Sequence, residues 1–112
     1  IYTLSLHDAL PIYEEKKEML SLERQVTEYT VPCFIWHTFE DRTVPVQNSV
    51  RMAEALHEKG IRTELHLFQK GSHGLGSAGE ESRRADGSGV QEECQCWMDL
   101  AYKWMENICK DQ

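Results

Sequence analysis

The stretch VPCFIWHT, residues Val31–Thr38, decides the predicted fold of this 112-residue chain. It is a nearly continuous apolar run, rich in bulky and aromatic side chains. Such a run is typical of a strand buried on both faces, as in a parallel sheet covered by helices. Pro32 fits near the beginning of such a strand, where no backbone donor is needed. We therefore predict a doubly buried parallel strand over residues 31–38.

A helix and a second strand are predicted to come after this run. The helix begins at Gln47 or Asn48 and continues through His57, and Gly60 stands where a helix-ending residue with positive φ is expected. Arg62–Phe68 (RTELHLF) then alternates polar and apolar side chains, which indicates a strand. A strand, a helix and a strand in this order predict a parallel βαβ unit with a right-handed crossover.

The other segments are predicted from their composition. Residues 13–28 are highly charged and predict a short surface helix or an irregular segment. Residues 71–89 hold six of the seven glycines and predict a mobile loop without a folded element. Residues 92–108 place apolar side chains on one helical face and predict an amphipathic helix that lies on a sheet. Residues 1–12 share no helical or strand period with the segment after them, and we expect a non-native or disordered stretch there.

The predicted fold class is α/β, with parallel strands and flanking helices, and the predicted fold is incomplete. A strand buried on both faces needs a neighbour on its other edge, and about three strands are the minimum for an independently stable sheet. Only two strands are recognisable here. Residues 13–112 therefore look like the C-terminal portion of a larger α/β domain.

The composition excludes several classes of partner. Asp and Glu number 19 against 12 Lys and Arg, and the net charge of −7 argues against a nucleic-acid or anionic-membrane surface, since either would need a basic stripe. No apolar run approaches the roughly 18 residues of a transmembrane helix. His7, Asp8 and Pro11 interrupt the apolar residues near the N-terminus, so no secretion signal is visible and we expect a cytoplasmic protein. The composition does not predict an oligomeric state.

Two residues stand where open parallel sheets build their sites. Asp41 comes three residues after the first predicted strand, and His73 comes five residues after the second. Both turns emerge at the carboxyl edge of the sheet, and neighbouring strands lie about 5 Å apart, so an acid and an imidazole on these turns can meet. Taken singly, Asp41 is typical of a turn and His73 of an exposed loop. Their paired placement favours a catalytic acid and base.

Two motifs, D-x-x-V-P beginning at Asp41 and G-x-H-G around His73, resemble those of the α/β-hydrolases. The similarity covers roughly residues 20–110 and includes esterases of the acetyl-xylan-esterase and dienelactone-hydrolase types and, behind them, the prolyl-oligopeptidase catalytic domain. The resemblance implies a serine hydrolase of carboxylic esters, often acetyl groups on carbohydrate, with Asp41 as the triad acid and His73 as the triad histidine. Glu40 competes for the acid role, because carboxylates of either length serve in this fold.

The triad nucleophile is not found in this sequence. No serine lies in a Gly-x-Ser-x-Gly turn: Ser72 follows a glycine directly, and Ser88 lies between adjacent glycines. We therefore expect the chain alone to be inactive and the nucleophile to lie upstream of residue 1. The alternatives are a non-catalytic binding module on the same fold and a peptidase of the prolyl-oligopeptidase type.

A metal site is the competing interpretation of the cysteines. Cys94 and Cys96, together with Cys33, Cys109 and His37, suggest ligands. On a helix, however, a C-x-C spacing directs the sulfurs about 200° apart, whereas zinc sites favour C-x-x-C or H-x-x-x-H. Buried or half-buried thiols are the favoured interpretation, so we expect neither a metal nor another cofactor.

Overall fold

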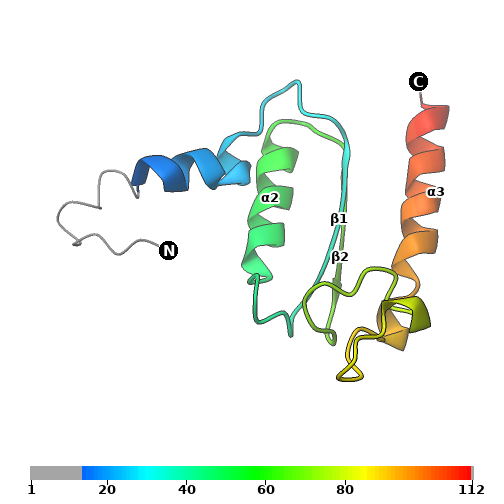
Figure 1. The fold of residues 1–112 in the computed structure, drawn as a ribbon. Coiled ribbons are helices and arrows are strands. Elements are labelled where there is room, and N and C mark those ends of the chain that lie inside the picture. The colour runs from blue at the N-terminus through cyan, green and yellow to red at the C-terminus, as the bar shows by residue number, and fades with distance from the viewer. Residues whose placement is uncertain (1–13, 112) are drawn as a thin grey trace, which may run out of the picture.

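The computed structural model describes residues 14–111, and its centre is a parallel βαβ unit (Figure 1). Strand β1 (Cys33–Thr38) leads into helix α2 (Gln47–Glu58), which leads into strand β2 (Thr63–Phe68). The strands pair in parallel, with Cys33 opposite Thr63 and Thr38 opposite Phe68. The two predicted strands, the helix between them and their parallel pairing are confirmed, but β1 begins at Cys33 rather than Val31. The predicted burial of this strand on both faces is not found within residues 14–111, where Thr38 is its one buried residue.

The two faces of the sheet are covered by different helices. Phe34 and Trp36 of β1 contact helix α3 (Trp97–Lys110): their rings lie 5.8 Å from Trp104 and 5.1 Å from Trp97. His37 points to the opposite face and hydrogen-bonds to Ser49 of α2. Helices α2 and α3 therefore lie on opposite sides of the strands, as Figure 1 shows, and the predicted α/β class is confirmed.

Helix α2 ends as its sequence predicts. Gly60 adopts φ 72°, and the backbone N–H of Ile61 donates to the carbonyl of Leu56 at 2.9 Å, which closes the last turn. The side chain of Leu56 is fully buried beneath this turn. After this turn the chain enters β2, which pairs in parallel with β1.

The predicted helix over residues 92–108 differs from the structure at its start. A 3-10 turn (Glu92–Cys94) comes first, and α3 begins only at Trp97. Cys94 is fully buried in this turn, where its thiol contacts the carbonyl of Lys70. Cys94 belongs to a buried cluster with Leu75 and Ala78. The chain therefore turns after Cys94 before α3 begins and runs along the sheet. The predicted apolar face of the helix is also wider than the surface of α3 that contacts the sheet, because Met98 and Met105 remain exposed.

The predicted mobile loop over residues 71–89 is wrong in one respect, because the segment contains folded structure. It includes a 3-10 turn (Glu80–Ser82), and its Leu75 and Ala78 are buried against Cys94. Trp36 and Phe68 of the two strands pack against this cluster. The glycine-rich loop is thereby held against the sheet by a cluster of three buried apolar side chains, two from the loop and one from the 3-10 turn after it.

The charged segment before β1 is helical over part of its length. Residues 14–20 form an exposed helix, followed by a 3-10 turn (Leu22–Arg24), and the predicted surface helix is confirmed over these residues. The stretch 1–12 lies outside the described residues. Among residues 14–111, no helix is long and apolar enough to cross a membrane.

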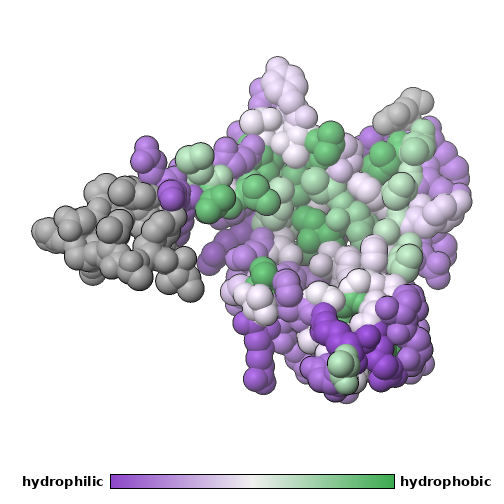
Figure 2. Space-filling model, viewed as in Figure 1, coloured by the Kyte–Doolittle hydropathy of each residue, from purple (hydrophilic) through white to green (hydrophobic). Residues whose placement is uncertain are grey.

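Much apolar surface has no cover in the described part of the chain. Within residues 14–111, strand β1 pairs with β2 alone, so its other edge is open. Three large side chains on α3 are more than half exposed, among them Tyr102 at 63% and Met105 at 57%. Figure 2 shows apolar surface gathered over the strands and between the two helices. This extent of exposed apolar surface is typical of a face that another part of a protein covers.

We expect the isolated chain to bind the dye 8-anilinonaphthalene-1-sulfonate and to melt over a broad temperature range, because among residues 14–111 nothing covers the free edge of β1 or the exposed apolar side chains of α3. Dye fluorescence and near-ultraviolet circular dichroism during heating measure both effects. A sharp cooperative melt of a monomer without dye binding would contradict this expectation.

Candidate active site

The backbone of its own turn fixes the carboxylate of Asp41. Asp41 comes three residues after β1, and its backbone N–H donates to the carbonyl of Thr38 at 3.4 Å. Its Oδ1 accepts hydrogen bonds from the backbone N–H groups of Thr43 at 2.9 Å and Val44 at 2.8 Å. The side chain is only 7% exposed. The D-x-x-V-P motif is therefore a tight turn that holds a buried carboxylate in one orientation.

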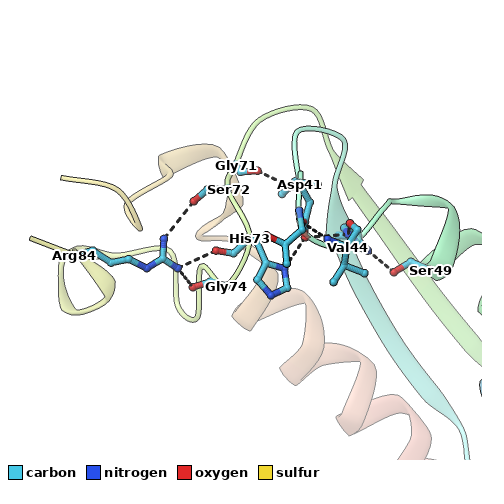
Figure 3. A network of polar contacts seen from close by, with 11 residues as sticks. Asp41, Val44, Ser49, Gly71, Ser72, His73, Gly74 and Arg84 are labelled. Atoms are coloured by element: carbon cyan, nitrogen blue, oxygen red, sulfur yellow. Dashed lines mark hydrogen bonds and ion pairs between the residues drawn. The ribbon is translucent and has the colours of Figure 1, made fainter. Parts of the chain in front are cut away.

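His73 meets this carboxylate from the neighbouring strand. Its Nδ1 lies 2.9 Å from Oδ2 of Asp41, and Figure 3 shows the ring directed at the Asp41 turn. Because a carboxylate only accepts hydrogen bonds, Nδ1 carries the proton and Nε2 of the neutral ring is left as a base. Among the described residues, none hydrogen-bonds to Nε2. The side chain is 49% exposed, so this nitrogen can reach a reacting group.

Gly71 brings the two turns together. Its carbonyl accepts a hydrogen bond from the buried hydroxyl of Thr38 at 2.6 Å, which joins the end of β1 to the loop after β2. Gly71 adopts φ 137°, and a Cβ there would lie 2.7 Å from a methyl group of Leu75 and 2.9 Å from Thr38. Only glycine fits this close approach. The loop can therefore leave β2 and place His73 over Asp41.

The pKa of Asp41 is lowered to about 2 from an ordinary value of 3.8. Burial acts to raise this pKa, but hydrogen bonds from Val44, from His73 and from Thr43 together outweigh it, and the positive charge of a protonated His73 adds to them. Asp41 is therefore an anion throughout the neutral pH range. A fixed negative charge at this place stabilises an imidazolium at His73.

Glu40, the competing acid, is directed elsewhere. Its Oε2 accepts a hydrogen bond from the backbone N–H of Gly71 at 3.2 Å. It makes no described contact with His73, whose Nδ1 is held by Asp41. The geometry therefore assigns Glu40 to the support of the loop and leaves Asp41 as the partner of the histidine.

His37 is part of the site and was considered in the sequence only as a metal ligand. It lies at the end of β1, is 10% exposed, and its Nε2 is 2.9 Å from the carbonyl of Val44 and 3.2 Å from Oδ2 of Asp41. Its Nδ1 is 2.6 Å from Oγ of Ser49. Since a carbonyl only accepts, Nε2 carries the proton and Ser49 donates to Nδ1 of the neutral ring. His37 thus supports the Asp41 turn through its contacts with Val44 and Asp41. Its position in the sequence, four residues before Asp41, is the feature that could have predicted this role.

The cysteines do not form a metal centre in the described part of the chain. All four thiols are free, and residues 14–111 contain no group of three side chains suited to hold a metal ion. Burial raises the pKa of Cys94 to about 11, with smaller contributions from Glu93 and Cys96. Burial also raises the pKa of Cys33. Protonated thiols are poor ligands, which agrees with a packing role for Cys94.

Two parallel strands, flanking helices and an acid–histidine pair at the carboxyl ends of the strands define part of an α/β-hydrolase fold. The sequence comparison identifies the family: residues 5–111 match the prolyl oligopeptidase family, and the chain belongs to it. The resemblance inferred from the two motifs is thereby confirmed.

Solved structures of esterases and sugar hydrolases share this fold. A carboxylesterase from Lactobacillus plantarum is 30% identical, with a TM-score of 0.73 over 76% of this chain and 31% of that chain. A sugar hydrolase from Lactococcus lactis is 31% identical, with a TM-score of 0.75 over 80% and 36%. An acetyl ester-xyloside bifunctional hydrolase from Caldicellulosiruptor lactoaceticus is 39% identical, with a TM-score of 0.69 over 80% and 29%.

A curated relative contains a segment similar to part of this chain within a longer protein. Endo-1,4-beta-xylanase B of Butyrivibrio fibrisolvens is 48% identical over 68 residues, which are 61% of this chain and 11% of the relative. The chain therefore spans about a third of the length of the hydrolase structures and about a tenth of the xylanase.

The low pKa of Asp41 gives a measurable pH dependence. Because the pKa is lower in the folded chain than the ordinary 3.8, the carboxylate stabilises the fold above about pH 4 and loses this effect as the pH falls towards 2. The full difference corresponds to about 2 kcal/mol. The ¹³Cγ shift of Asp41 in a chain labelled at aspartate should titrate near pH 2 in buffer and near 3.8 in concentrated urea. Equal midpoints would show that the turn does not hold the carboxylate.

Proposed function

We propose that this chain supplies the acid and the base of a serine hydrolase that acts on carboxylic esters. Asp41 is the acid and His73 the base, and the nucleophilic serine lies outside residues 1–112. The observation that carries the proposal is the 2.9 Å contact between a buried, ionised carboxylate and an exposed imidazole at adjacent strand ends. Family membership and the esterases among the similar structures support it.

The geometry of the pair suits proton transfer in two directions. Nε2 of His73 takes the proton of the serine hydroxyl as that oxygen attacks the ester carbonyl, and then donates it to the departing alcohol. A water deprotonated by the same nitrogen attacks the acyl-enzyme and releases the acid. Throughout, Asp41 holds the Nδ1 proton in place and stabilises the positive ring by its charge.

The proposed serine nucleophile must be encoded elsewhere in the gene. The coding sequence upstream of Ile1 should contain a Gly-x-Ser-x-Gly turn between a strand and a helix, because no serine of this chain has that context. The chain alone should then be inactive. A complete reading frame in which the nucleophile position holds no Ser, Cys or Asp would instead identify a non-catalytic binding module.

In the longer gene product, Asp41→Asn should lower kcat for an aryl acetate by about 10³-fold or more, because the amide donates to Nδ1 and inverts the tautomer of His73. Glu40→Gln is the matched control, with an expected change within about threefold, since it keeps the acceptor for Gly71. Steady-state kinetics measure both, and circular dichroism verifies folding. A larger loss in the Glu40 variant would reassign the acid.

We propose acetyl esters of carbohydrates as the substrate class. The support is the 39% identity to an acetyl ester-xyloside bifunctional hydrolase and the 48% identity to a segment of a xylanase. The second candidate is a peptidase, which is favoured by the family that residues 5–111 match.

The two substrate classes can be separated in one experiment on the longer gene product. We expect release of acetate from acetylated xylo-oligosaccharides at a kcat/KM at least about 100-fold above that for a proline-containing peptide anilide, a difference of roughly 3 kcal/mol in transition-state binding. Acetate release and anilide absorbance give the two rates. A preference for the anilide would establish the peptidase.

A further inference from the structure

The guanidinium group of Arg84 binds the backbone of the turn that carries His73. Its Nη2 donates to the carbonyl oxygens of His73 at 2.8 Å and Gly74 at 2.5 Å. Its Nη1 lies 3.2 Å from the hydroxyl of Ser88 and 3.5 Å from that of Ser72. Figure 3 shows the Arg84 side chain reaching towards Ser72, His73 and Gly74. One side chain thus joins residues 72–74 to a turn more than ten residues further along.

Residues 84–88, from which the Arg84 side chain extends, form a hydrogen-bonded turn. The backbone N–H of Arg84 donates to the carbonyl of Ser88 at 2.8 Å, and Asp86 accepts hydrogen bonds from the N–H and hydroxyl of Ser88. Gly89 adopts φ 96°, and a Cβ there would lie 2.1 Å from the carbonyl oxygen of Ser82, so the chain returns in close contact with itself. Arg84 therefore extends from a defined backbone position.

We propose that Arg84 is a positioning residue for His73. Resting on the proposed function, this inference assigns to Arg84 the task of holding the His73 turn so that Nδ1 stays on Asp41 and Nε2 faces the reacting serine. Gly74 at φ 72° has no side chain to anchor the turn, and the His73 ring itself is half exposed. The hydrogen bonds from Arg84 to the His73 and Gly74 carbonyls hold the two successive peptide groups that follow His73.

The shape of arginine is essential to this role. A planar guanidinium presents donors in a rigid fork and can bind two carbonyls and two hydroxyls at once, whereas a lysine ammonium is a point charge on a flexible stem. Arg83 provides a matched control in the adjacent position. Its guanidinium pairs with Glu80 at 2.7 Å on the exposed surface and makes no described contact with the His73 turn.

The experiment compares Arg84→Lys, Arg84→Gly and Arg83→Lys in the longer gene product. For Arg84→Lys we expect a kcat about tenfold lower for an aryl acetate with KM within about twofold, since a displaced catalytic group affects the chemical step. Amide hydrogen exchange in peptides covering residues 71–76 should become faster. Guanidinium chloride, far below denaturing concentration, should restore part of the kcat of Arg84→Gly. Arg83→Lys should change neither kcat nor exchange.

Each result bears on one of the two proposals. Unchanged exchange at residues 71–76, or an unchanged kcat, in Arg84→Lys would overturn the positioning role. A loss in Arg84→Lys matched by Arg83→Lys would also overturn it, because the effect would then be one of surface charge. If the unmutated protein turned over neither esters nor peptides while exchange responded to Arg84 alone, the proposed function would fail and the hold of Arg84 on the His73 turn would stand.

Discussion

The hydrogen bond between Asp41 and His73 depends on the parallel register of β1 and β2. Thr38 and Phe68, the last residues of the two strands, are paired, so the chain leaves both strands at the same level. Asp41 and His73 each need only a few residues to meet from there, at 2.9 Å. A slip of one residue would turn every strand side chain to the other face and would also separate the two turns. The same register that stacks Trp36 over the loop core therefore sets the geometry of the site.

The two partners divide the work through their surroundings. Asp41 is 7% exposed and its turn supplies two backbone donors, so its charge and orientation are fixed before any ligand arrives. His73 is half exposed and makes one side-chain contact, so its free nitrogen can exchange a proton. His37 holds the carbonyl of Val44 through Nε2, and Ser49 donates to Nδ1 of the same ring. A fixed carboxylate beside an imidazole whose second nitrogen is accessible is the arrangement that acid–base catalysis requires.

The sequence predicted the features that local patterns encode. The run Val31–Thr38, the positive φ of Gly60 and the short distances from strand ends to Asp41 and His73 all result from residue type and period. The segment 71–94 was beyond such reasoning, because its order comes from contacts made at a distance. Leu75 and Cys94 order this segment by packing against each other and against Trp36 and Phe68 of the sheet. Arg84 hydrogen-bonds to the carbonyl of Gly74, ten residues earlier. Glycine content indicated a loop correctly, but it carries no information about which side chains close the loop.

The distribution of order in the structure also explains why this segment can hold a site without a complete core. Among residues 14–111, five hydrophobic side chains are buried, and three of them, Leu75, Ala78 and Cys94, form one cluster that includes two residues of the loop carrying His73. The hydrogen bond from Thr38 to the carbonyl of Gly71 is buried beside them. The large apolar side chains that remain exposed lie in the segment before β1, at Phe39 and on α3, and none of them belongs to this cluster. The acid–histidine pair is thus supported by a cluster that the described segment forms from its own side chains, and none of these side chains depends on a cover over the open sheet edge.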